Sequence, residues 1–432
     1  MKYKASVLLK IFLLVLLVNI SAVSEQPNDA NNLTELDDYL TFTALNNAGL
    51  EAAFEQWKSA LEQVPQSGSL PDPKFTYGYF IKEIETRTGP QRQRLSLMQT
   101  FPWFGKIEAR TDAASAAAKA AHKRYEAAKL ELFYKVKDLY YEYAYLGQAV
   151  ELAKQNLELL KHFEEVARTR YTAAAGSHPD IIRAQIELAT LEDKLKSLEE
   201  MRKPIVIGLN SVLNRGNDSS LPWPAKQQFI PVTLDHQVIV DKMIAGNPQL
   251  QALDFEVAAA KAKIELARKK FYPDISLGVD WIQTDKAISA GVRDSGKDPV
   301  IAMLSINLPF WTDSYKAAQL QAKAQMRSHA ARKVQSRNDL LAQLEKVLYE
   351  FEDSARKVNL FEGILIPKAK EMLEASEVAY KAGTLDFLSL IDAQRTLLEF
   401  ELSYERAVTT NLQKLAQLEM LVAEQLTGKT AD

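Results

Sequence analysis

The chain contains no cysteine. Disulfide bonds, thiolate metal sites, cysteine nucleophiles and a lipid attached through an N-terminal cysteine are therefore excluded. The net charge is also small, because 53 basic and 56 acidic side chains leave a formal charge of −3. Proteins that bind nucleic acid through bulk charge carry a clear excess of lysine and arginine, so we expect no nucleic-acid partner.

Enzyme signatures are missing as well. The sequence has no GxGxxG, P-loop, HExxH or GxSxG spacing, the patterns that hold nucleotides, zinc or a serine nucleophile. Its five histidines are scattered, and His162, beside Glu164 and Glu165 in a charged helical segment, is expected to be a surface residue. We therefore expect no enzymatic activity, no metal site and no cofactor.

The N-terminus has the order of a secretory signal peptide. Lys2 and Lys4 precede an apolar run from residue 5 to residue 18, and small residues follow that run. We assign residues 1–24 to a signal peptide, with cleavage after Ala22 or Ser24. The alternative is an N-terminal membrane anchor, but the run is shorter than the roughly 20 residues that a membrane-crossing helix needs.

The rest of the chain is a duplication. The context of Asn47 (NNAGLEA) resembles that of Asn247 (GNPQLQA), and LPDP, TFPW and RY…G…AQ return in the same order as YPDI, NLPF and AY…G…AQ. The offset between matching positions rises only from 200 to 209 residues, far longer than the period of a solenoid repeat. We predict two structural repeats, residues 25–230 and 231–432, each opening with a helix (35–64 and 233–270).

Each repeat contains two short runs of alternating apolar and polar residues. The runs cover about 74–82 and 93–101 in the first repeat and 275–283 and 300–308 in the second, with polar loops expected at 83–91 and 284–299. Alternation over about ten residues fits a half-buried strand and equally a transmembrane strand. Alternation of this kind more commonly indicates an ordinary hairpin. Aromatic residues near the ends of these runs, however, are typical of strands that meet a bilayer interface; they are Phe101, Trp103, Phe104, Tyr272, Trp281, Phe310 and Trp311.

Four strands are too few for a membrane-spanning barrel, because single-chain barrels begin at about eight. Open strand edges in lipid would leave backbone groups unpaired, at several kcal/mol each. If these strands enter a membrane, several copies must pool them, and three copies would supply about twelve.

Heptad spacing dominates the segment after each strand pair. Apolar residues step by four and three from Leu132 to Leu160 and again from Leu340 to Leu365, the pattern of coiled-coil packing. We predict long helices at about 106–174 and 312–382, with return helices at 179–214 and 385–426. The first would be about 100 Å long at 1.5 Å per residue.

Glycines punctuate these helices. Gly176 and Gly383 stand where each heptad pattern stops, so we expect a chain reversal with positive φ at both. Pro102 is expected to end a strand, with Gly105 redirecting the chain into the long helix.

These features resemble the TolC family of outer-membrane efflux channels. The carriers are the duplicated order, LPDP before a strand, QTFPWFGK, YKAG at Gly383 and DAQ at 392–394. The resemblance covers essentially the whole mature chain, and the proline-aromatic joints are most similar to the branch that serves heavy-metal and drug pumps. It implies a mainly α fold with a small antiparallel β part, in which a trimer forms a 12-stranded β-barrel on a 12-helix α-barrel.

The resemblance also implies a function and a location. The protein would be a passive channel of a tripartite efflux or type I secretion system, in the outer membrane of a Gram-negative bacterium and extending into the periplasm. Its partners would be two further copies of itself, outer-membrane lipid, a periplasmic adaptor (membrane fusion) protein and an inner-membrane pump of the RND or ABC type. The alternative is a periplasmic coiled-coil adaptor or a structural interaction protein, which would normally show one helical hairpin rather than two.

In the family, polar contacts near the hairpin tips close the periplasmic end of the tunnel. Asp180 and Asp392 match acidic positions of family members, and Arg170, Tyr171, Arg183 and Tyr380 are candidate partners. Charges on a coiled-coil face are otherwise commonly solvated or paired along the helix. Adaptor docking is expected at four residues of the tips: Gly176, Ser177, Gly383 and Leu385. This chain has Leu385 where the family prototype has a basic residue, which is a departure from the family's gate pattern.

Overall fold

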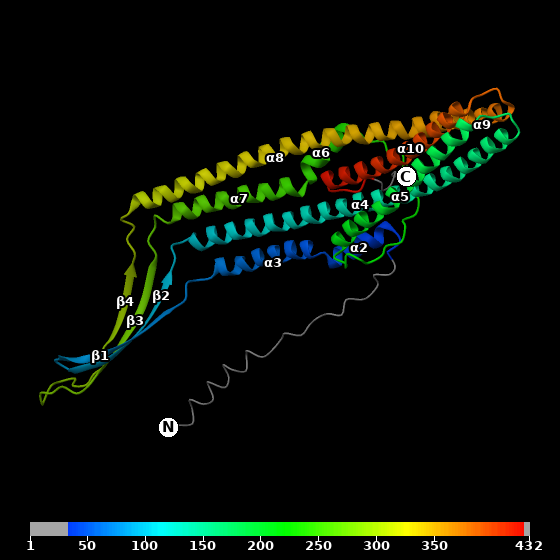
Figure 1. Ribbon diagram of the computed structural model, residues 1–432. Helices are drawn as coiled ribbons and strands as arrows, with labels where there is room; N and C mark the ends of the chain where they lie inside the picture. Colours follow the sequence, from blue (N-terminus) through cyan, green and yellow to red (C-terminus); the bar gives the residue numbers. More distant parts are fainter. Residues whose placement is uncertain (1–32, 427–432) are drawn as a thin grey trace, which may run out of the picture.

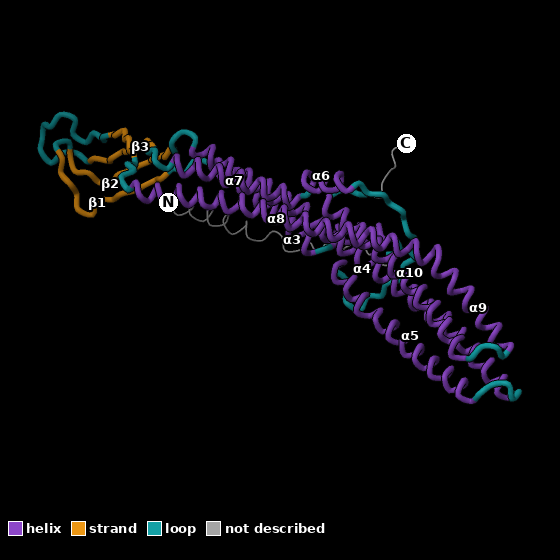
Figure 2. Tube along the Cα trace, turned by 90° about the horizontal axis from the view of Figure 1, so that it is seen from above, coloured by secondary structure: helices purple, strands orange, loops and turns teal. Residues whose placement is uncertain are grey.

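The computed structural model describes residues 33–426, so the expected signal peptide lies outside the described residues. The chain is a long rod with a β-sheet at one end and two helical hairpins at the other (Figures 1 and 2). Within the described part no helix has both the length and the apolar character needed to cross a membrane.

The two halves contain the same elements in the same order. The first has α2 (Leu36–Asn46), α3 (Ala48–Gly68), β1 (Lys74–Thr86), β2 (Gly89–Phe101), α4 (Lys106–Thr172) and α5 (His178–Leu213). The second has α6 (His236–Gly246), α7 (Pro248–Lys269), β3 (Ile275–Thr284), β4 (Val300–Ile306), α8 (Thr312–Leu360), the π-helical segment η1 (Phe361–Leu365), α9 (Ile366–Ala382) and α10 (Phe387–Val422). The predicted fold class, mainly α with a small antiparallel sheet, is confirmed.

Each repeat begins with two helices where the sequence predicted one. Asn47 separates α2 from α3, accepts a hydrogen bond from the Leu50 amide at 2.9 Å and donates one to the Val212 carbonyl at 2.7 Å. Asn247 does the same between α6 and α7, toward the Leu250 amide and the Leu421 carbonyl. A side chain that caps one helix and ties it to the end of the return helix explains why each helix breaks there.

The strands form one antiparallel sheet in the order β1-β2-β3-β4. The expectation of a polar loop at 83–91 is wrong, because β1 continues to Thr86 and β2 begins at Gly89. Segment 82–86 is largely polar, so periodicity did not reveal it; backbone pairing with β2 makes it a strand. β1 and β4 are the outer strands, and each has one edge without a partner in the described chain.

The long helices pack through the predicted heptads. Val136, Tyr143 and Leu160 of α4 are buried, as are Leu344 and Phe351 of α8. α10 packs between α4 on one side and the α8–α9 arm on the other, so the two hairpins share one core near their tips. A buried amide pair, Gln394 to Asn156 at 2.9 Å, lies inside that core.

Candidate functional site

The first hairpin tip turns through residues 173–177. Ala174 has the positive φ (+54°), and the Ala175 amide donates to the Arg170 carbonyl at 2.8 Å. The expectation of positive φ at Gly176 is wrong. Glycine is favoured there for lack of space, since a Cβ would lie 3.0 Å from Arg170 Cβ and from the Tyr171 amide nitrogen.

The second tip follows the predicted geometry. Gly383 has φ +80°, and the Thr384 amide donates to the Ala379 carbonyl at 3.0 Å. Asp386 then caps α10 by accepting from the Ser389 amide at 2.7 Å. That hydrogen bond holds the pKa of Asp386 below its ordinary value.

Arg170 connects the two tips. Its guanidinium carbon lies 4.6 Å from the centre of the Tyr380 ring on α9, and its Nη2 donates to the Ala175 carbonyl at 2.9 Å. A Cβ on Gly383 would lie 3.2 Å from the same Nη2. Arg170 Nε and Nη1 and the Tyr380 hydroxyl are buried without a hydrogen-bond partner in the described chain. The contact is therefore a cation–π pair against the hydrophobic core cluster to which Tyr380 belongs.

Asp180 acts on this pair from the first turn of α5. Burial raises the pKa of Tyr380, the negative charge of Asp180 raises it further, and Arg170 opposes the rise. Three of the six candidate gate residues, Asp180, Arg170 and Tyr380, thus share one electrostatic environment at the joined tips.

The other three candidate gate residues lie outside this cluster. The Tyr171 ring lies 5.6 Å from His178, while the charge of exposed Arg183 reaches Asp386 and contributes to the lowered pKa of that carboxyl. Asp392 is exposed on α10, and its backbone carbonyl accepts a hydrogen bond from the Thr396 hydroxyl at 2.8 Å. Of the docking candidates, Ser177 is exposed and Leu385 half-buried, both next to the turns.

The sheet has one apolar and one polar face. Register places Phe75, Leu97 and Val279 side by side, with Leu277 and Leu304 in the next row on the same face. All five side chains are exposed although they are apolar. The opposite face presents Thr76, Ser96, Asp280, Arg94, and a hydrogen bond between Thr100 and Ser276 at 2.8 Å, with Met98, Ile282, Ile301 and Met303 interspersed. An exposed apolar face of this size needs a nonpolar environment.

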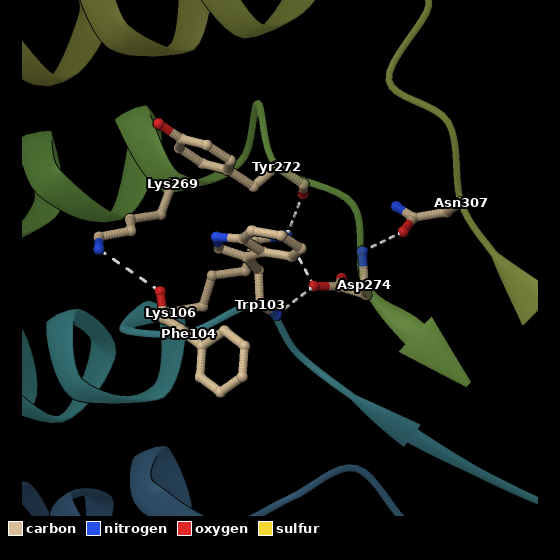
Figure 3. A network of polar contacts seen from close by, with 7 residues as sticks. All are labelled: Trp103, Phe104, Lys106, Lys269, Tyr272, Asp274 and Asn307. Carbon is tan, nitrogen blue, oxygen red and sulfur yellow. Dashed lines mark hydrogen bonds and ion pairs between the residues drawn. The ribbon is translucent and has the colours of Figure 1, made fainter. Parts of the chain in front are cut away.

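A polar latch joins sheet to helices (Figure 3). Asp274, just before β3, accepts from the Trp103 amide at 2.8 Å and forms an ion pair with Lys106 at 2.7 Å, and its own amide donates to Asn307. Lys106 also donates to the Tyr272 carbonyl at 2.8 Å. The strand-to-helix joints of both repeats are thereby fixed to each other, an arrangement that sequence reasoning missed.

Gly105, which was expected to redirect the chain into the long helix, has a positive φ of +79°. A Cβ there would lie 2.7 Å from the Lys269 ammonium nitrogen, which donates to the Phe104 carbonyl at 3.4 Å. Both conformation and space therefore favour glycine at this joint.

The seven candidate interface aromatics divide by their surroundings. Trp103 stacks on Tyr272 with ring centres 5.5 Å apart, inside the latch. Phe101, Phe104, Phe310 and Trp311 are exposed at the same end of the sheet. Trp281 belongs to the apolar face near the other end of β3, opposite Leu95 and Val300.

Comparison with known proteins identifies the family. A model of the outer membrane efflux protein family matches residues 43–215 and 239–424. The toxin and drug export protein A of Aggregatibacter actinomycetemcomitans is 26% identical over 278 residues, which are 62% of this chain and 59% of that relative's length. The cobalt-zinc-cadmium resistance protein CzcC of Cupriavidus metallidurans is 22% identical over 401 residues, 89% of this chain and 88% of the relative.

The fold agrees with solved channels. The structure of the MtrE outer membrane channel of Neisseria gonorrhoeae, in its open state, superposes with a TM-score of 0.74 at 20% identity, over 92% of this chain and 91% of that one. The chain therefore belongs to the outer membrane efflux protein family; it is a Gram-negative outer-membrane protein that extends into the periplasm, and it is not an enzyme.

Proposed function

We propose that three copies of this chain form the channel of a tripartite efflux or type I secretion system. Cargo enters at the hairpin tips from a pump and adaptor assembly and leaves through the sheet end. The observation that carries the proposal is the sheet: four strands with two free edges and an exposed apolar face. Three such sheets, joined edge to edge, supply the closed hydrogen bonding that a membrane requires.

The transport is passive. Among the described residues there is no cluster of acidic or histidine side chains suited to a metal ion, and the chain carries no nucleotide-binding motif. In this proposal the energy comes from the pump, driven by ATP or a proton gradient, and this chain supplies a water-filled conduit. The aromatics at the joint end of the sheet sit at the bilayer interface in this assembly.

The hairpin tips form the gate. The Arg170–Tyr380 contact holds the two hairpins of one copy together, with Asp180 beside them. Opening separates or twists the hairpins when adaptor tips dock around Gly176, Ser177, Gly383 and Leu385. Asp392, which is exposed within one copy, is available to a neighbouring copy.

Planar-bilayer recording of the purified protein tests the function. We expect ion current, small for the native chain and larger after Asp180→Ala combined with Asp392→Ala, because both carboxylates are assigned to closed-gate contacts. A complete lack of current in both proteins would contradict the channel function. Fractionation adds a second readout: the protein should require detergent for release, whereas release with the periplasmic contents would favour an adaptor-type interaction protein.

The cargo is a separate question. A deletion strain tested against a panel of metal salts and drugs should show increased sensitivity to the exported class. An export role would be contradicted if the deletion strain and its parent grew equally well in the presence of every compound of the panel and secreted the same proteins.

A further inference from the structure

One ion pair crosses from β2 to β3 on the polar face of the sheet. The carboxylate of Asp280 contacts the guanidinium of Arg94. Asp280 is 0% exposed, and neither of its carboxylate oxygens has a hydrogen-bond partner within residues 33–426. A buried carboxylate is costly unless a positive charge compensates it, so Asp280 depends on Arg94.

The register explains how the two side chains meet. Arg94 lies opposite Gly78 and Ile282, while Asp280 lies opposite Ser96. The pair is therefore diagonal across neighbouring strands, within reach of a long arginine side chain.

The surroundings of the pair are crowded. A Cβ on Gly278 would lie 3.1 Å from the Leu97 carbonyl oxygen and 3.2 Å from Met303 Cε. Arg94 Nη2 lies 3.9 Å from the sulfur of the same methionine. This crowding covers Asp280 and leaves the outer part of the guanidinium open.

The two charges are unequally exposed. The Arg94 side chain is 47% exposed and that of Asp280 is 1% exposed. An ion moving along the polar face therefore meets the guanidinium of Arg94 first. The buried carboxylate of Asp280 neutralises the charge of that guanidinium. In the proposed assembly the polar face lines the water-filled interior, because the apolar face contacts lipid.

We propose that the Arg94–Asp280 pair, repeated in each copy, sets the ion selectivity of the exit through the sheet. This inference rests on the proposed function and adds residues distant from the hairpin tips. While the pair is intact, each copy contributes a nearly neutral site to the wall. Loss of Asp280 leaves the positive charge of Arg94 in a confined aqueous path, where its field acts on passing ions.

The substitutions act in opposite directions. Asp280→Asn keeps the shape and leaves Arg94 uncompensated, so the channel should favour anions more than the native protein does. Arg94→Gln leaves a buried carboxylate that is costly to keep ionised, so its shift toward cations should be smaller than the opposite shift in Asp280→Asn. The double variant restores neutrality and should return to the native ratio. Asp280→Asn is expected to change the anion-to-cation permeability ratio by about two- to five-fold at low salt, and less at high salt.

The measurement is the reversal potential in planar bilayers under a KCl gradient. All variants are compared in one background, Asp180→Ala with Asp392→Ala, so that the exit and not the tip limits the current. Glu55→Gln is the matched control: it also removes one carboxylate that pairs with a basic partner, Lys58, but in α3 of the helical part, and the ratio should not change.

The outcomes separate the two proposals. Current with an unchanged permeability ratio in both single variants would overturn the selectivity role and leave the pair as a brace between strands. A shift in Glu55→Gln as large as that in Asp280→Asn would also overturn it. A lack of any current in all proteins would overturn the channel function and this inference with it.

Discussion

At the residue scale, the two hairpin tips use glycine for different physical reasons. Gly383 adopts a left-handed conformation that other residues enter only at a cost. Gly176 has no such φ but lies against the backbone of α4, while Ala174 takes the left-handed position. The sequence marks both positions as turns, but it cannot distinguish strain in the backbone from lack of space.

Gly383→Ala should lower stability by about 1 kcal/mol, because L-residues disfavour this φ. The control is Gly363→Ala in the π-helical segment η1, where a Cβ would meet no atom within 4 Å; it should stabilise the protein by about 0.5 kcal/mol. Thermal unfolding followed by circular dichroism measures both. Equal shifts in the two variants would show that the tip conformation carries no strain.

Arg170→Ala should increase the open fraction of the channel, because it removes the cation–π contact that joins the hairpins, worth about 1 kcal/mol. Tyr380→Phe keeps the ring and should remain close to native. Arg183→Ala is the control, since the charge of Arg183 acts on the pKa of Asp386, whereas the pKa of Tyr380 responds to Asp180 and Arg170. Single-channel recording measures the open fraction. An open fraction raised equally by Arg183→Ala would contradict a specific role of the Arg170–Tyr380 contact in closing the channel.

A bulky residue at Ser177 or Leu385 should abolish export while leaving trimer yield unchanged, because both lie next to the turns where adaptor tips are proposed to dock. Ser177→Trp and Leu385→Trp are compared with Glu55→Trp on α3, which should export normally. The assays are resistance in cells and the amount of detergent-extracted oligomer. Normal export by both tip variants would argue against docking there.

At the element scale, the periodicity of the sequence predicted those features that depend on neighbouring residues of the same helix or strand. The apolar heptad positions of α4 and α8 are buried as expected, because the spacing along one helix already places them on the same face. The breaks at Asn47 and Asn247 were missed because they depend on carbonyls about 165 and 174 residues away. The last part of β1 was missed because its pairing, not its hydrophobicity, makes it a strand.

The candidate site was predictable only in outline. The resemblance placed acidic and basic residues near the tips, but the meeting of Arg170 with Tyr380 depends on how one hairpin lies against the other. The latch at Asp274 and Lys106 joins residues 168 positions apart. In the sequence only the repeated Pro-Asp at LPDP and YPDI pointed to it.

An introduced charge should be harmful on one face of β2 and tolerated on the other. Leu97 belongs to the exposed apolar face and its neighbour Ser96 to the polar face. Leu97→Arg should reduce membrane insertion, because arginine facing lipid near the bilayer midplane costs about 2–4 kcal/mol. Ser96→Arg should be tolerated much better. The amount of heat-modifiable oligomer in the outer-membrane fraction measures both, and equal loss would show that neither face meets lipid.

At the scale of the whole molecule, one chain is an incomplete wall. The helical layer continues the sheet along the rod (Figure 1), and the sheet ends at β1 on one side and β4 on the other. Three copies that pair β4 with the next copy's β1 satisfy these edges in a closed ring. The native chain has no cysteine, so any disulfide in an engineered variant reports only the introduced pair.

The most direct test is therefore disulfide cross-linking of the sheet edges in membranes. Cysteines are introduced at Thr76 of β1 and at Ile301 of β4, both on the polar face, with Gly78 and Met303 as the alternative register. One of these pairings should give a covalent trimer on non-reducing gels. Cysteines at Ser96 and Ile301 are the control and should give none, because β2 is an inner strand. A chain that stays monomeric in every register, or a ladder that continues past the trimer, would contradict the closed channel.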